Sequence, residues 1–160
     1  MRIIGIDPGT TITGIGIVDC DDRGDCSPVF FGVLKPGRDG LARGMARLHR
    51  ELADLVTTWQ PETAAVEGVF YGVNVKSTVT LAHARGVALA VLGEAGLSVA
   101  EYSPAAVKKT LAGYGQADKE QIRFLVEQQL GISLVTEPLD VSDALAIAIC
   151  HGQHLVFGGG

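Results

Sequence analysis

The stretch RIIGIDPGTTITGIGIV, residues 2–18, constrains the fold more than any other part of the sequence. Two runs rich in β-branched residues, 2–7 and 12–18, flank the turn-type sequence PGTT, and this arrangement predicts a β-hairpin. The first run ends in one carboxylate, Asp7, within otherwise apolar surroundings. The sequence therefore predicts a buried strand that holds a single acidic side chain in a fixed place.

The remaining segments alternate between strand and helix patterns. Helical spacing of apolar residues predicts two long helices, and Ser103-Pro104 has the form of an N-cap followed by proline at the first helical position. The predicted order is strands at 2–7, 12–18 and 29–34, a helix at 40–59, a strand at 63–67, a helix at 76–95, a strand at 97–102, and helices from 104, from about 118 and over 140–154. This order predicts an α/β fold with a single mixed five-stranded sheet flanked by helices.

Length and composition indicate one globular unit. The chain has 160 residues, of which 47% are hydrophobic, and no apolar run is long enough to span a membrane. We expect one domain over residues 1–156 with a flexible glycine-rich tail at 157–160. The N-terminal residues lack the pattern of a signal peptide, so a cytoplasmic protein without membrane association is expected.

The cysteines and the net charge limit the classes of function. Cys20, Cys26 and Cys150 form an odd set without metal-ligand spacing, which favours ordinary reduced thiols over a disulfide framework or a zinc site. The formal net charge of −5 is unusual for a protein that binds nucleic acid, because phosphate binding commonly requires a basic excess.

Four carboxylates stand at the ends of predicted elements. Asp7 and Glu67 end strands, whereas Asp140 and Asp143 begin the last helix three residues apart, where they share a face. If these oxygen ligands converge, they suit Mg²⁺ or Mn²⁺, and a pair of such ions serves phosphoryl chemistry. Taken singly, three of them have a structural alternative: Asp7 as a turn residue, Asp140 as an N-cap, and Asp143 as a first-turn acid. Glu67 has no obvious capping role.

Longer motifs make the acidic pattern specific. They are IGIDPGTTITGIG around Asp7, VEGVFYGVNVKSTVTLAHARGVAL around Glu67, VKKTLAGYGQADKEQI, and DVSDALAIAICH at the last helix. Over essentially the entire chain, the sequence closely resembles the RuvC Holliday junction resolvases, endonucleases with the RNase H-like fold. This resemblance implies a metal-dependent enzyme that resolves four-way DNA junctions in recombination and repair by paired symmetric nicks, leaving 5′-phosphate and 3′-hydroxyl ends.

The resemblance also implies roles for individual residues. Asp7, Glu67, Asp140 and Asp143 fall on the catalytic, metal-binding positions of the family, which implies a site for two Mg²⁺ or Mn²⁺ ions per subunit. Phe70 matches an aromatic residue that stacks on a base, and Lys108 and Lys119 match basic positions that hold the DNA backbone or act near the scissile phosphate. From the residues alone, further DNA contacts are predicted at Tyr71, Lys76, Lys109 and Arg123. The alternative is that the aromatic residues cover the core and that each basic side chain lies on a solvated face.

Partners follow from the same reasoning. Two opposed cuts need two acidic clusters, which a two-fold homodimer supplies. We expect the interface on helix 76–95, whose apolar residues include Val79, Leu81, Ala82, Val87, Leu89 and Val91. Family analogy implies the RuvA and RuvB branch-migration proteins as partners. Two divalent ions would bring the charge from −5 to −1, so the acidic composition does not exclude DNA.

Two rival interpretations come from other classes of protein. The opening hairpin also resembles the phosphate-binding hairpin of actin-like nucleotide-binding domains, in which glycine N–H groups hold a phosphate. Those proteins bind nucleotide between two such domains, whereas this chain has the length of one. The other rival is a non-catalytic module that binds four-way junctions and uses its acids structurally.

Overall fold

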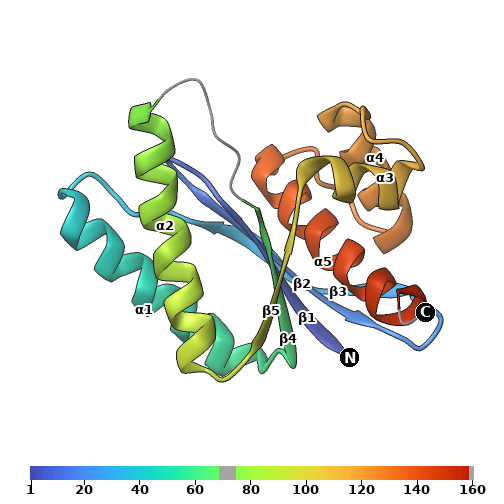
Figure 1. Ribbon diagram of the computed structural model, residues 1–160, viewed down its shortest axis with the longest axis horizontal. Coiled ribbons are helices and arrows are strands. Elements are labelled where there is room, and N and C mark those ends of the chain that lie inside the picture. The colour runs from blue at the N-terminus through green and yellow to red at the C-terminus, as the bar shows by residue number, and fades with distance from the viewer. Residues whose placement is uncertain (69–74, 159–160) are drawn as a thin grey trace.

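The computed structural model describes residues 1–68 and 75–158 (Figure 1). Its centre is a mixed five-stranded sheet with the strand order β3-β2-β1-β4-β5. The first three strands are antiparallel neighbours, and β4 and β5 continue the sheet parallel to β1. The strands are β1 (Arg2–Pro8), β2 (Thr13–Cys20), β3 (Cys26–Leu34), β4 (Thr63–Glu67) and β5 (Ser98–Tyr102). The predicted fold class and the order of its elements are confirmed.

Helices cover both faces of the sheet (Figure 1). One face packs against α1 (Leu41–Trp59) and α2 (Val75–Glu94), and the other packs against α3 (Pro104–Ala112), α4 (Lys119–Leu130) and α5 (Leu139–Phe157). Alternate residues of β1 therefore enter two separate cores: Ile3 on the α5 side, and Ile4 and Ile6 on the α1 side. Within the described ranges, no helix has the length and hydrophobicity that a membrane span requires.

Helix α5 lies unusually close to the sheet because glycines of β1 and β2 make room for it. A Cβ atom built on Gly5 would collide with the carbonyl oxygen of Ala144, and one built on Gly14 would collide with that of Asp140. At Gly16, a Cβ would stand 2.7 Å from the backbone nitrogen of Leu145. Backbone packs directly on backbone here, so the start of α5 is fixed against the strand pair that carries Asp7.

The hairpin between β2 and β3 differs from the sequence prediction. Strand β3 begins at Cys26 rather than at residue 29, because Cys20 and Cys26 pair directly across the two strands. The structure joins these two residues in a disulfide, so the expectation of three reduced thiols is wrong; only Cys150 is free. The cysteine count gave no sign of the pair, because contact across the hairpin depends on the register.

The helix starts confirm two predictions and correct one. The hydroxyl of Ser103 accepts a hydrogen bond from the backbone nitrogen of Ala106, with Pro104 at the first helical position. Asp118 caps α4 in a reciprocal capping box with Gln121. The N-cap of α5 is Pro138, which makes no side-chain capping bond. Asp140 is therefore not the N-cap, and its carboxylate is not used to close the helix end.

Candidate active site

Asp7 and Glu67 lie on neighbouring strands and face the same side of the sheet. Strands β1 and β4 run parallel, with Ile6 paired to Val66 one residue before each acid. Side chains alternate along a strand, so Asp7 and Glu67 both point toward α5. Asp7 is 7% exposed and Glu67 is half-buried. Two carboxylates thus meet at the carboxyl end of two parallel strands, where open α/β sheets place their sites.

The start of α5 brings the other two acids to the same edge. Gly14 pairs with Asp7 across the hairpin, and a Cβ at Gly14 would lie 3.2 Å from the Cβ of Asp140. Asp143 follows one helical turn later and is also partly buried. The close packing of α5 on the hairpin glycines is therefore what places Asp140 and Asp143 beside the strand acids.

Electrostatics show how strongly these carboxylates interact. The pKa of Asp7 is raised from 3.8 to about 9, chiefly because burial disfavours its charged form. The negative charges of Glu67, Asp143 and Asp140 contribute to the same shift. Burial also raises the pKa of Glu67, although its hydrogen bond with Asp7 opposes that rise. Without added positive charge, Asp7 keeps a proton at neutral pH and shares it with Glu67.

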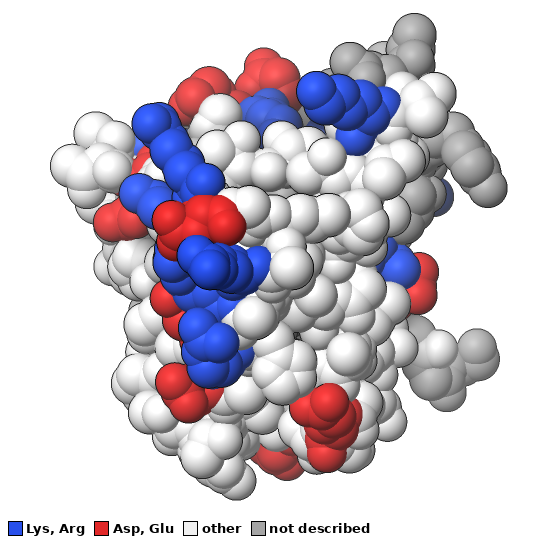
Figure 2. Space-filling model, turned by 90° about the vertical axis from the view of Figure 1, so that its left-hand side faces the viewer, with Lys and Arg blue, Asp and Glu red and all other residues white. Residues whose placement is uncertain are grey.

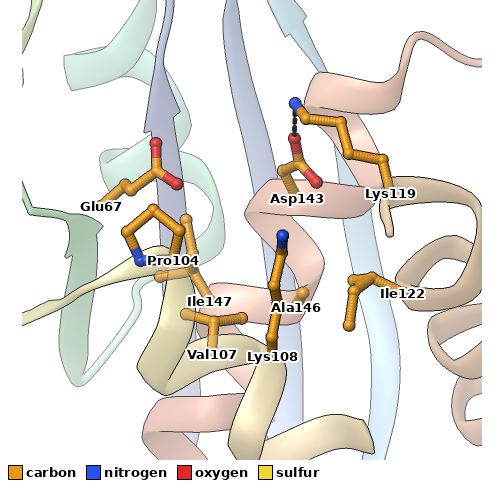
Figure 3. A pocket seen from close by; sticks show the side chains of 9 residues that line it. All are labelled: Glu67, Pro104, Val107, Lys108, Lys119, Ile122, Asp143, Ala146 and Ile147. Carbon is orange, nitrogen blue, oxygen red and sulfur yellow. Dashed lines mark hydrogen bonds and ion pairs between the residues drawn. The ribbon is translucent and has the colours of Figure 1, made fainter. Parts of the chain in front are cut away.

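A pocket of about 150 Å³ opens beside the acids (Figure 3). Glu67 and Asp143 border it from two elements, and Lys108 of α3 directs its ammonium group toward the space between them. Lys119 of α4 donates a hydrogen bond of 2.8 Å from Nζ to Oδ2 of Asp143. This bond raises the pKa of Lys119 and keeps the amine charged. The pocket thus has both signs of charge, with an apolar floor that includes Val107 and Ile147.

Arg85 of α2 holds the main chain at Glu67. Its Nε donates to the carbonyl oxygen of Glu67 at 3.4 Å, and its Nη2 forms an ion pair of 2.6 Å with Oε2 of Glu101. The Arg85 side chain is only 14% exposed. The backbone nitrogen of Gly68 donates to the carbonyl of Tyr102 at 2.8 Å. Glu67 is thus fixed from both sides, by an ion-paired arginine and by strand β5.

The remaining predicted DNA contacts are placed differently. Phe70 and Tyr71 lie outside the described residues. Lys109 is exposed but does not line the pocket, and Lys76 is exposed near the start of α2. Arg123 turns away from the acids, since its Nη2 donates to the carbonyl oxygen of Leu134. Of the predicted basic residues, the structure brings Lys108 and Lys119 to the acids.

The donor set suits a hard divalent cation. Carboxylate oxygens without histidine or cysteine are the ligands that Mg²⁺ and Mn²⁺ prefer, and a cation would remove the repulsion that raises the pKa of Asp7. As the side chains stand, however, no three His, Cys, Asp or Glu groups within residues 1–68 and 75–158 are close enough to enclose a metal ion. Lys119 engages Asp143, and Asp7 is hydrogen-bonded to Glu67; both are contacts that a bound cation would displace.

Sequence reasoning missed two supports of this arrangement. One is the pair of glycines Gly5 and Gly14. Glycine inside an apolar strand was the available sign that another backbone packs closely there. The other is the hydrogen bond from Arg85 to the main chain of Glu67: the sequence indicates that this arginine could border the acids, but not this contact, because the two residues lie on different elements. Both supports depend on long-range packing rather than on a local pattern.

The mixed sheet with helices on both faces and an acidic carboxyl edge defines the RNase H-like class of folds, which includes DNA junction nucleases. A family model described as "Crossover junction endodeoxyribonuclease RuvC" matches residues 3–151. The chain therefore belongs to the RuvC family.

Individual relatives agree over nearly full length. The chain is 47% identical to the crossover junction endodeoxyribonuclease RuvC of Koribacter versatilis, covering 94% of this chain and 92% of that protein. It is 48% identical to the RuvC of Acidobacterium capsulatum, covering 96% and 94%. Among solved structures, Thermus thermophilus RuvC in complex with a Holliday junction substrate matches with a TM-score of 0.91 at 32% identity, covering 99% of this chain and 96% of that chain.

Proposed function

We propose that the protein is a structure-selective endonuclease that resolves four-way DNA junctions by paired symmetric nicks during recombination and repair. The observation that carries this proposal is the buried Asp7–Glu67 pair, held beside the two acids of α5 at one end of the sheet. The family and the junction-bound relative support the choice of substrate. We further propose that residues 1–156 belong to one nuclease domain; Phe157, the first residue of the predicted tail at 157–160, is the last residue of α5, and residues 159–160 lie outside the described residues.

Two Mg²⁺ or Mn²⁺ ions per subunit are the proposed cofactors. Asp7 lies between Glu67 on one side and the α5 acids on the other, so it is the residue suited to contact both ions. Asp140, Asp143 and Glu67 supply the other carboxylate oxygens. When bound, such ions activate water and stabilise the charge of the leaving oxygen in phosphodiester hydrolysis.

The protein's own side chains orient the phosphate and supply charge. Lys108 faces the space between Glu67 and Asp143, where its ammonium group can hold a phosphate oxygen. Lys119 is charged beside Asp143, where its ammonium group can contact the scissile phosphate. Attack by water with departure of the 3′ oxygen leaves a 5′-phosphate and a 3′-hydroxyl. Phe70 is proposed to stack on a base, with further DNA contacts from Tyr71, Lys76, Lys109 and Arg123.

A two-fold dimer supplies the second cut. The outer side of α2 exposes Val75 and Val79 at 75% and 50%, followed by small residues at Ala82, Gly86 and Ala90. Apolar and small side chains on one exposed helical face permit close approach of an identical helix. Sedimentation that shows only monomer at micromolar concentration would contradict this arrangement.

The distribution of acids supports DNA as the substrate despite the net charge of −5. Asp21, Asp22 and Asp25 lie in the turn between β2 and β3, at the end of the sheet opposite Asp7. Repulsion from this turn is weak at the active site because of the distance and salt screening. A cytoplasmic location and cooperation with the RuvA and RuvB branch-migration proteins complete the proposal by family analogy.

Cleavage of a synthetic four-way junction tests the proposal directly. The wild-type protein is compared on the junction and on a linear duplex of matched sequence, with Mg²⁺, Mn²⁺ or chelator. Paired nicks in opposed strands of the junction alone, and only with metal, are expected. Binding without cutting under every condition would instead establish a non-catalytic junction-binding module, and absence of both would remove DNA junctions as the substrate.

A further inference from the structure

The arginines of this protein fall into two groups. Arg2, Arg23, Arg47 and Arg85 form ion pairs with carboxylates, and Arg123 donates to a main-chain carbonyl. The other three, Arg38, Arg43 and Arg50, are exposed and form no ion pair with any described residue. Lys35 is exposed in the same way. All the unpaired arginines therefore belong to one short segment, residues 35–50.

These side chains form one continuous surface, which we call the arginine band. Arg43, Arg47 and Arg50 are spaced by four and three residues, so they share one side of α1. The buried side of that helix is opposite and consists of Gly44, Leu48, Leu52 and Val56. Figure 2 shows Lys and Arg side chains gathered in a column on this face of the molecule. The arginine band consists of Lys35, Arg38, Arg43, Arg47 and Arg50.

Arg47 fixes the loop that leads into the helix. Its Nη1 donates to the carbonyl oxygen of Pro36 at 3.2 Å, and its Nη2 donates to Oδ2 of Asp39 at 2.6 Å. These bonds hold residues 36–39 against α1, so the exposed Lys35 and Arg38 lie in a segment that packs beside the helical arginines. Asp39, the one acid within residues 35–50, is neutralised by this pairing. The band is thus pre-organised as a positive surface before any ligand binds.

The arginine band begins at the same end of the sheet as the acids. Leu34, which precedes the band, pairs with Thr13, and Thr13 pairs with Pro8, the neighbour of Asp7. Two strand spacings separate the start of the band from Asp7, about 10 Å. Lys108 and Lys119 belong to the α5 face of the sheet, whereas the band belongs to the α1 face. The acids therefore have basic side chains on both sides.

We propose that the arginine band binds the phosphate backbone of a junction arm at a distance from the cleaved bond. This inference rests on the proposed function and adds a second DNA contact on the α1 face. Guanidinium groups bind phosphate oxygens in a bidentate manner, and exposed, unpaired arginines lose no existing ion pair on binding. From Arg43 to Arg50 the helix rises about 10 Å, the axial length of about three phosphates of one DNA strand.

The salt dependence of junction binding tests this proposal. Binding to a junction with long arms is measured in chelator, from about 50 to about 200 mM salt, for wild type, Arg43→Gln and Arg50→Gln. Each substitution is expected to weaken binding and to reduce the slope of log K against log salt by about 0.9, the value for one lost phosphate contact. The matched control is Arg23→Gln, which removes one charge at the far end of the sheet and is expected to leave the slope unchanged.

Arm length separates this contact from the active site. A junction trimmed to the base pairs beside the crossover is expected to bind wild type and the two band variants equally, because the distal phosphates are missing. If Arg43→Gln and Arg50→Gln show the same slope as Arg23→Gln on long arms, the proposal is overturned. The arginine band would then be assigned to binding an acidic protein. Wild type that neither binds nor cuts the junction would instead overturn the proposed function itself.

Discussion

Helices α5 and α1 have the same length, 19 residues, and cover opposite faces of one sheet, yet they are packed in different ways. Nearly every residue of α5 from Val141 to Gly152 is buried, and its backbone rests on strand glycines. Only four residues of α1 are buried, and leucine side chains separate it from the sheet. Helix α5 fixes carboxylates in place, whereas α1 leaves a whole side free for charged groups.

This difference suggests a division between chemistry and attachment. Metal ligands must hold their geometry to within a fraction of an ångström, which suits a helix packed backbone to backbone. Binding to a phosphate backbone tolerates side-chain motion, which suits long arginines on an exposed helix. Substitutions on the two faces should therefore have different consequences.

The largest effect is expected from an acid on the α5 face. Asp7→Asn should lower junction cleavage by at least about a thousandfold, because it removes the charged oxygen between the proposed metal positions. Junction binding should persist. Asp22→Asn, the same chemical change in the exposed turn between β2 and β3, is the control and should cut at the wild-type rate. Single-turnover cleavage rates check both variants, and full activity of Asp7→Asn would refute the assignment.

The close packing of α5 gives the second largest effect. Gly5→Ala would force a methyl group into the backbone of Ala144 and should destabilise the protein by about 3 kcal/mol. Gly32→Ala on β3 is the matched control, since its Cβ would meet nothing closer than 3.6 Å and should be nearly neutral. Urea unfolding measures both. Equal stability of the two variants would mean that α5 is not held by the glycines.

The disulfide of the β2–β3 hairpin lies away from both functional surfaces. It closes a loop of six residues, so Cys20→Ser should lower stability by about 2 kcal/mol under oxidising conditions and far less in reductant. Junction cleavage should not change. Thermal unfolding with and without reductant checks this prediction, and a variant equally destabilised in both conditions would show that packing, not the bond, is responsible.

Arg85 of α2 donates to the main chain of Glu67, so its substitution should lower cleavage, but by less than Asp7→Asn does. Arg85→Gln removes the ion pair with Glu101 and loosens the main chain at Glu67, so we expect cleavage to fall about tenfold with a higher metal requirement. A metal titration of the cleavage rate measures this, with junction affinity as the reference. Arg85→Lys should recover part of the rate. A uniform loss of affinity and Tm without a change in metal dependence would indicate a purely structural role.

The buried acid also predicts how stability depends on pH. In the folded protein the pKa of Asp7 is about 9, against 3.8 when unfolded, so between these values the folded state binds an extra proton. Stability of the metal-free protein should therefore fall as pH rises through this window, by about 1.4 kcal/mol per pH unit at most. Asp7→Asn should lack this slope. Thermal unfolding in chelator from pH 5 to pH 9 compares the two, and parallel curves would contradict the raised pKa.

Much of this arrangement could be predicted from sequence, because it depends on local patterns. Apolar periodicity and turn residues gave the order of strands and helices, and the positions of Asp7 and Glu67 at strand ends followed from that order. Their common location in the structure agrees with the prediction. The catalytic role of each acid stays a prediction until the variants are measured.

The rest depends on contacts between distant segments. The Cys20–Cys26 bond required the register of the hairpin, and the burial of α5 on all sides required the glycines of two other strands. The ion pair of Lys119 with Asp143 joins two helices that no spacing rule connects. Such features arise from tertiary packing, which a single sequence does not encode in any local pattern.

The N-terminus and the end of α5 lie near each other, far from the acids. The terminal amino group of Met1 donates to the carbonyl oxygen of Cys20 at 2.8 Å, and Phe157 at the end of α5 lies near Gly24 in the turn that follows Cys20. Figure 1 shows the N-terminus and the end of α5 at the lower right, away from the start of α5. A fluorescent label or surface tether attached at the end of α5 would therefore leave both basic surfaces open to DNA, so that single resolution events can be watched on an immobilised protein.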